Sequence, residues 1–174
     1  MGIDRDTLAL AGEFAVASQL CRLGTYAQLT LGSRKRTDLL VEAENHMIRV
    51  QVKAKQGKVW PAAKGVHGSD IVLVLVDYHK KGNTERPDFY VLTPADWVKV
   101  LTAALVETGK VANGDVKLSA EYVPTWKDGF VGMSLRAEYV APFKEAWEKI
   151  VAPGSSAPGG AVLPNKAPHL TGGA

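Results

Sequence analysis

Residues 47–54, MIRVQVKA, and residues 71–76, IVLVLV, decide how this chain folds. In the first stretch apolar and polar side chains alternate, which predicts a strand with one buried face and one polar face. The second stretch has no polar side chain, so it predicts a central strand that is covered on both faces of its sheet. Together they indicate a mixed α/β domain built around one sheet.

Patterns around these two strands add helices and further strands. A helix is predicted from about residue 7 to residue 23, because Asp4 or Asp6 can cap its start and Gly24 follows its end. The run Thr93-Pro94-Ala95-Asp96 is typical of a capped helix start, and this helix is predicted to reach about residue 106. Other strands are predicted over residues 26–31, 39–41 and 88–93.

Three stretches give weaker patterns. Residues 55–69 contain three glycines and a Trp-Pro pair, which predicts an irregular, lysine-rich connection. Residues 115–140 predict irregular structure with short strands near Tyr122 and Val131. Residues 142–151 predict a closing helix with four inward side chains, Phe143, Ala146, Trp147 and Ile150.

Length and composition fit one globular domain. The 174 residues are 46% hydrophobic and 22% charged, which excludes a disordered or fibrous chain. We expect a folded domain over residues 3–152 and a flexible tail over residues 153–174, where nine of 22 residues are Gly or Pro. The single cysteine excludes a disulfide framework, and the absence of a long apolar window predicts a soluble, cytoplasmic protein.

The positive charge gathers in the first third of the chain. The net charge of +3 is too mild to indicate a polyanionic partner by itself. Residues 1–60 hold nine basic and six acidic side chains, and the basic ones include Arg34, Lys35, Arg36, Lys55 and Lys58. A cluster of this size, taken alone, is most often a solvated face.

Four polar side chains stand out by their position. Glu13 is the one acid between residues 7 and 21, on an otherwise apolar helix, and Asp38 starts a hydrophobic strand. Gln51 and Lys53 project from the same face of a strand because they are two residues apart. Each also has an ordinary interpretation. Glu13 can be an exposed helix acid, and Asp38 can be a strand-start acid paired with a nearby arginine. Gln51 and Lys53 can be the polar side of a half-buried strand.

In combination, the segments Gly12-Glu13, Thr37-Asp38-Leu39-Leu40 and Val50-Gln51-Val52-Lys53 resemble the motifs of the PD-(D/E)xK nuclease superfamily. The resemblance covers roughly residues 7–100 and looks closest to small enzymes similar to Holliday junction resolvases and to homing endonucleases associated with group I introns. Thr37 stands where the family has proline, and Gln51 stands where it usually has an acid, although some members use Gln there. The resemblance implies a restriction-endonuclease-like αβββαβ core.

The same resemblance implies a Mg²⁺-dependent endodeoxyribonuclease, with Mn²⁺ as a substitute, that hydrolyses phosphodiester bonds in double-stranded or branched DNA. It implies Glu13, Asp38, Gln51 and Lys53 as catalytic residues. Oxygen ligands suit Mg²⁺, and the implied ligands are Asp38, the Gln51 amide, the Val52 carbonyl and Glu13. Lys53 is then placed to orient or activate the attacking water.

DNA is the implied partner, and six basic residues that bracket the motifs are the candidates for binding its phosphates: Arg34, Lys35, Arg36, Lys55, Lys58 and Lys64. Cutting both strands of a duplex needs two sites, so a homodimer or higher oligomer is expected. Because Gln51 replaces an acid, the alternative is a nucleic-acid-binding module whose nuclease site is inactive. A protein-interaction scaffold is a third possibility.

Overall fold

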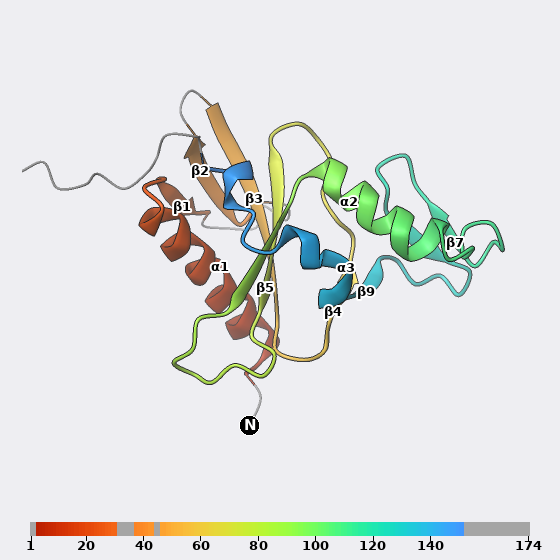
Figure 1. Cartoon of the computed structure of the whole chain (residues 1–174), viewed down its shortest axis with the longest axis horizontal. Helices are drawn as coiled ribbons and strands as arrows, with labels where there is room; N and C mark the ends of the chain where they lie inside the picture. Colours follow the sequence, from red (N-terminus) through yellow and green to blue (C-terminus); the bar gives the residue numbers. More distant parts are fainter. Residues whose placement is uncertain (1–2, 31–36, 44–45, 152–174) are drawn as a thin grey trace, which may run out of the picture.

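A five-stranded mixed sheet forms the centre of the computed structural model, which describes residues 3–30, 37–43 and 46–151 (Figure 1). The strand order is β1-β2-β3-β5-β6, with β3 and β5 parallel and the other neighbours antiparallel. The strands are β1 (Ala27–Leu29), β2 (Leu39–Ala43), β3 (His46–Lys55), β5 (Ile71–Asp77) and β6 (Asp88–Leu92). The single mixed α/β domain predicted from the sequence is confirmed.

The central strand β5 is buried along its whole length, as its sequence predicts. Val72, Val74 and Val76 belong to one hydrophobic cluster, on the face that α1 covers. The alternate residues Ile71, Leu73 and Leu75 belong to a second cluster on the opposite face. Because both faces of β5 are covered, the strand has no position at which a polar side chain reaches water.

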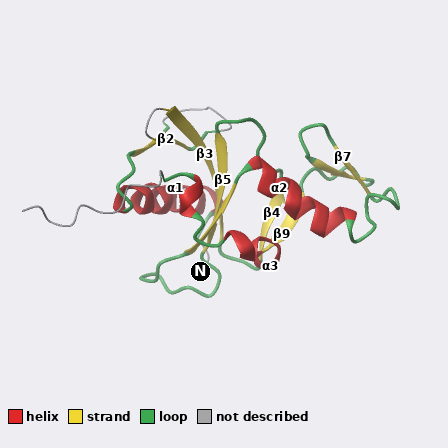
Figure 2. Ribbon diagram, turned by 45° about the horizontal axis from the view of Figure 1, so that its top comes forward, coloured by secondary structure: helices red, strands yellow, loops and turns green. Residues whose placement is uncertain are grey.

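Helix α1 (Arg5–Arg22) covers one face of the sheet and crosses β3 at very short range (Figure 2). Asp4 caps its start by accepting hydrogen bonds from the backbone N–H groups of residues 6 and 7. A Cβ atom at Gly12 would lie 2.8 Å from the Cβ of Ala54, so only glycine allows this approach. The Tyr78 hydroxyl donates to the carbonyl of Ala11 at 3.1 Å and ties the same turn of the helix to the end of β5.

The other face is covered by α2, α3, β4 and β9, which Figure 2 shows on the side of the sheet away from α1. Thr93 and Asp96 form the expected capping box at the start of α2, and the helix continues through a π-helical turn to residue 106. Trp60 and Trp97 are the largest buried side chains of this cluster. The elements are β4 (Val59–Ala63), α2 (Pro94–Leu101), β7 (Val116–Leu118), β8 (Pro124–Trp126), β9 (Met133–Arg136) and α3 (Ala137–Val140).

The connection between the parallel strands β3 and β5 differs from what the sequence predicts. Residues 55–69 are not wholly irregular, because β4 forms within them and pairs with β9. This strand stands where an αβββαβ order implies a helix between the third and fourth core strands. Its formation depends on the burial of Trp60, whose indole N–H donates to the carbonyl of Val76 at 3.1 Å.

The closing helix predicted over residues 142–151 is wrong. Two short 3₁₀ turns, Ala141–Phe143 and Trp147–Lys149, are separated by Glu145, which has a φ of 55°. The Glu145 carboxylate accepts two hydrogen bonds from Arg86, and these long-range bonds favour an extended connection over a helix. Trp147 and Ile150 are nevertheless buried, as predicted.

The ambiguous region 115–140 contains three short strands, β7, β8 and β9, with Tyr122 and Val131 in the segments between them. The tail predicted over residues 153–174 lies outside the described residues. No helix in the described part of the chain is long and apolar enough to cross a membrane.

We predict that Gly12→Val lowers the free energy of unfolding by about 2 kcal/mol or more, because the new side chain overlaps Ala54 and forces α1 away from β3. Chemical denaturation measures the change. The control is Ser18→Val on the exposed side of the same helix, where we expect a change of about 0.5 kcal/mol or less because serine and valine have similar helix propensities. Equal losses in the two variants would contradict the close contact.

Candidate functional site

The candidate site lies just before the start of β2, where β3 extends beyond its β2 partner. The β2–β3 pairing stops at Leu39 and Val50, but β3 extends to Lys55. Residues 52–55 therefore pair with β5 on one side and have no β2 residue on the other; we call this segment the open edge of β3. An unpaired strand edge leaves backbone groups available to other partners.

Asp38, the residue before β2, lies against the open edge of β3. Its backbone N–H donates to the carbonyl of Val50 at 2.9 Å, and its carboxylate oxygen Oδ2 accepts from the N–H of Val52 at 2.6 Å. The Asp38 side chain thus accepts the hydrogen bond that a backbone carbonyl before β2 would accept if the strand pairing continued. Two contacts to one strand fix the carboxylate against β3.

Gln51 and Lys53 lie on the face of the sheet that α1 does not cover. Val50 and Val52 point toward α1, so the residues that alternate with them point the other way. Asp38 precedes the first residue of β2, and its carboxylate reaches the backbone N–H of Val52 at the edge of β3. The structure therefore places Gln51 and Lys53 on one face of β3 and holds Asp38 at the neighbouring edge of that strand.

Glu13 comes from α1, and its charge is coupled to that of Asp38. Burial raises the pKa of Glu13, and the negative charge of Asp38 raises that pKa further. Burial also raises the pKa of Asp38, while the N–H of Val52 and the positive charge of Lys53 act in the opposite direction. Two partly buried carboxyl groups and one lysine therefore share one electrostatic environment, in which a bound cation would favour both carboxylates.

The oxygen atoms at the open edge fit a hard divalent cation. Arg49 and Lys55 make backbone hydrogen bonds toward the β5 side, so Val52, at an alternate position, directs both its N–H and its carbonyl toward the open edge. The oxygen atoms that the sequence assigns to a metal, from two carboxylates, one amide and one carbonyl, are of the kind that Mg²⁺ prefers. No group of three His, Cys, Asp or Glu side chains that could hold a metal exists among the described residues, so such a site needs Gln51 and Val52.

The predicted phosphate-binding residues divide into three groups. Lys58 and Lys64 are exposed, and Lys64 lines the same hollow as Gln51, with a volume of about 460 Å³. Arg34, Lys35 and Arg36 lie outside the described residues. Lys55 is not a surface residue, contrary to its assignment from the sequence.

Lys55 belongs to the core. It is 3% exposed, forms an ion pair with Asp77 at 2.7 Å and lies over the ring of Trp60 at 4.5 Å from the ring centroid. Asp77 lies opposite Lys55 in the parallel pairing of β3 and β5. Because its charge is neutralised inside the protein, Lys55 is removed from the set of candidate DNA contacts.

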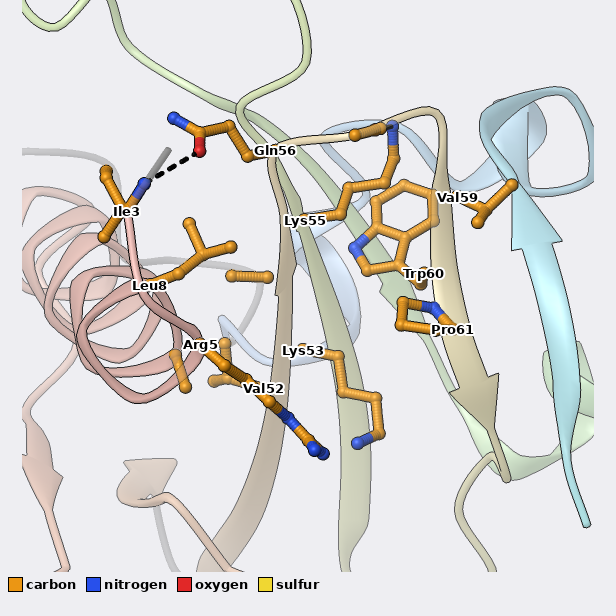
Figure 3. A pocket seen from close by; sticks show the side chains of 13 residues that line it. Ile3, Arg5, Leu8, Val52, Lys53, Lys55, Gln56, Val59, Trp60 and Pro61 are labelled. Carbon is orange, nitrogen blue, oxygen red and sulfur yellow. Dashed lines mark hydrogen bonds between the residues drawn. The ribbon is translucent and has the colours of Figure 1, made fainter. Parts of the chain in front are cut away.

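A second hollow, of about 440 Å³, lies beside Lys53 between the start of α1 and β4 (Figure 3). Its lining includes Arg5 and Leu8, which the sequence analysis did not single out. Arg5 lies eight residues before Glu13, on the same helix, and this link to the motif is the one signal in the sequence that points to it.

Comparison with solved structures finds a limited likeness. A solved structure of a bacterial homing endonuclease, I-Ssp6803I, is similar to this chain with 22% sequence identity and a TM-score of 0.38, over 53% of this chain and 66% of that chain. No family of known sequences and no curated protein matches the chain. A TM-score of this size carries no argument about function.

We predict that Asp38→Asn stabilises the protein near neutral pH. The amide oxygen can still accept from the N–H of Val52, and the buried charge is removed. Because the folded-state pKa of Asp38 is raised, ionisation destabilises the wild type as the pH rises through that pKa. The advantage of the variant should therefore vanish below the ordinary pKa of 3.8. Thermal unfolding over a pH series measures it.

Asp70→Asn is the control with the opposite sign. Hydrogen bonds from Arg49 lower the pKa of Asp70, so its charge stabilises the fold above the ordinary pKa and this contribution is lost as the pH falls. We expect this variant to be slightly less stable than the wild type near neutral pH. A loss of stability in Asp38→Asn at that pH would contradict the prediction.

Proposed function

We propose that this protein is a metal-dependent endonuclease that hydrolyses phosphodiester bonds of DNA at the open edge of β3. The observation that carries the proposal is the hydrogen bond between Asp38 and the N–H of Val52, which holds a carboxylate beside Lys53 and within electrostatic reach of Glu13. The order of these residues along the chain also resembles the PD-(D/E)xK motifs, with Gln51 in the place of an acid.

In this proposal, each residue has a distinct role. Asp38, Glu13, the Gln51 amide and the Val52 carbonyl would hold Mg²⁺, with Mn²⁺ as a substitute. When bound, such a cation neutralises phosphate charge and lowers the pKa of a coordinated water. Lys53 orients the attacking water and stabilises the negative charge that develops on the phosphoryl oxygens.

The DNA substrate is supported by the charges around the edge. Lys58 lies in the turn between β3 and β4, and Lys64 lines the hollow beside Gln51, so both are exposed near the two active-site strands. Phosphate contacts of this kind position a nucleic acid without reading its sequence. Cleavage of both strands of a duplex further requires a second active site, which we propose comes from a second copy of the chain.

One observation favours an alternative function. Gln51 contributes no negative charge, and an amide in place of a carboxylate weakens the binding of a divalent cation. The alternative is a nucleic-acid-binding module that keeps the nuclease fold without catalysis. The two functions differ in whether the open edge binds a divalent cation.

We predict that the purified protein nicks supercoiled plasmid DNA in Mg²⁺, and that Lys53→Ala and Asp38→Ala each reduce the rate roughly a hundredfold or more. Gel electrophoresis over a time course measures the rate. Lys117→Ala, on the exposed surface of β7, is the control and should cleave like the wild type. Equal nicking by all four proteins would assign the activity to a contaminant.

We predict that Gln51→Glu binds Mn²⁺ about tenfold more tightly than the wild type, because the new carboxylate adds a negative charge to the ligand set. Titration calorimetry with Mn²⁺ measures the affinity. Gln28→Glu, the same change at an exposed position of β1, should leave the affinity unchanged. If neither the wild type nor Gln51→Glu binds Mn²⁺ while DNA binding remains sensitive to salt, the inactive binding module is the correct function.

A further inference from the structure

We propose that the hollow beside Lys53 binds the nucleotide next to the cleaved bond, with Arg5 binding its phosphate. This inference rests on the proposed function and extends it by a substrate subsite and a positioning residue. The hollow lies between the first turns of α1 and the strands β3 and β4, and its lining includes Lys53 whereas Gln51 lines the other hollow.

The charge of the hollow favours an anion. Three basic side chains line it, Arg5, Lys53 and Lys55, and no acid is among the described residues of its lining. The charge of Lys55 is neutralised by Asp77, whereas Arg5 and Lys53 form no ion pair with any described residue. Arg5 and Lys53 are therefore two cations without an ion pair in one hollow, and the charge of Lys53 also acts on Asp38, outside its lining.

These two cations act at the same end of the hollow. In Figure 3 the charged ends of Arg5 and Lys53 point to the same side of the view, while the amine of Lys55 points to the opposite side, beside Gly57. Like charges repel when they converge, and a phosphate between them would remove the repulsion. Arginine suits this role because its guanidinium can donate two parallel hydrogen bonds to one phosphate.

The rest of the hollow suits the sugar and base of a nucleotide. Apolar side chains line the hollow from both sides. They include Ile3, just before α1, Leu8 in α1, and Val59 and Pro61 in β4. A volume of about 440 Å³ lies in the range of about 300–1,000 Å³ that is usual for small-molecule pockets. A nucleotide combines an anionic phosphate with an uncharged ring system, which matches one cationic end and one apolar wall.

A DNA strand is a better occupant than a free nucleotide because Lys53 belongs both to the hollow and to the proposed active site. A strand that places its cleaved bond at Lys53 must direct a neighbouring nucleotide to one side or the other. Arg5 adds a contact to that neighbour, so it acts on the position of the substrate and not on the reaction itself.

Fluorescence anisotropy with a labelled DNA duplex in Ca²⁺ or EDTA tests the subsite. We expect Arg5→Ala to weaken binding about fivefold to tenfold and to reduce the dependence of log K on log salt by about one. Arg5→Lys should recover part of the affinity. Arg22→Ala, an exposed arginine in the last turn of the same helix, is the matched control and should change affinity less than about twofold. Ala9→Phe should also weaken binding, because it fills the hollow without a change in charge.

Steady-state cleavage separates positioning from catalysis. Arg5→Ala should raise KM and leave kcat nearly unchanged, whereas Lys53→Ala should lower kcat. Equal DNA affinity in Arg5→Ala and Arg22→Ala would overturn the subsite. If Arg5→Ala loses binding to a free deoxynucleoside monophosphate but binds DNA like the wild type, the hollow binds a free nucleotide and not a DNA strand. If an acidic peptide displaces the labelled DNA as well as unlabelled DNA does, the specificity for phosphate is overturned.

The outcomes also separate this inference from the proposed function. If the wild type cleaves DNA and Arg5→Ala behaves like Arg22→Ala, the endonuclease assignment stands and the subsite fails. If the wild type does not cleave DNA in Mg²⁺ or Mn²⁺ but binds it through Arg5, the subsite stands and the catalytic assignment fails. Thermal unfolding of each variant checks that the fold is retained.

Discussion

The hydrogen bond from the N–H of Val52 to the carboxylate of Asp38 is the interaction on which the site depends. Just before the start of β2, a side-chain hydrogen bond thus takes the place of a backbone hydrogen bond of the sheet. An acid held in this way cannot swing freely into solvent, and it lies beside the strand that carries Lys53. Because β2 starts only at Leu39, β3 is left unpaired beyond Val50, and the carboxylate of Asp38 fills part of this gap.

This arrangement is unfavourable for stability in the absence of a cation. Burial raises the pKa of both Asp38 and Glu13, so each group resists ionisation in the folded protein. Perturbed acids that lie close together are a common property of functional sites, although structural ion pairs also perturb pKa values. Here neither acid has an ion-pair partner among the described residues, which favours the functional interpretation.

The sequence predicted features that depend on local pattern and missed those that depend on distant partners. The alternation of β3, the buried run of β5 and the cap of α2 are local, and all three are confirmed. Lys55 was misassigned because its partner Asp77 is 22 residues away on a neighbouring strand. Strand β4 was missed because its pairing partner, β9, lies some 70 residues later and Pro61 interrupts its pattern. The roles of Glu13, Asp38, Gln51 and Lys53 remain predictions.

The contact at Gly12 determines both how closely α1 packs on the sheet and where Glu13 lies. One turn of α1 is held against the sheet by the glycine contact with Ala54 and by the bond from Tyr78, and Glu13 is the next residue along the helix. A small slide or lift of the helix would separate the two acids while every strand stayed paired. Partial loosening of this one helix would therefore separate the two acids without unfolding of the sheet.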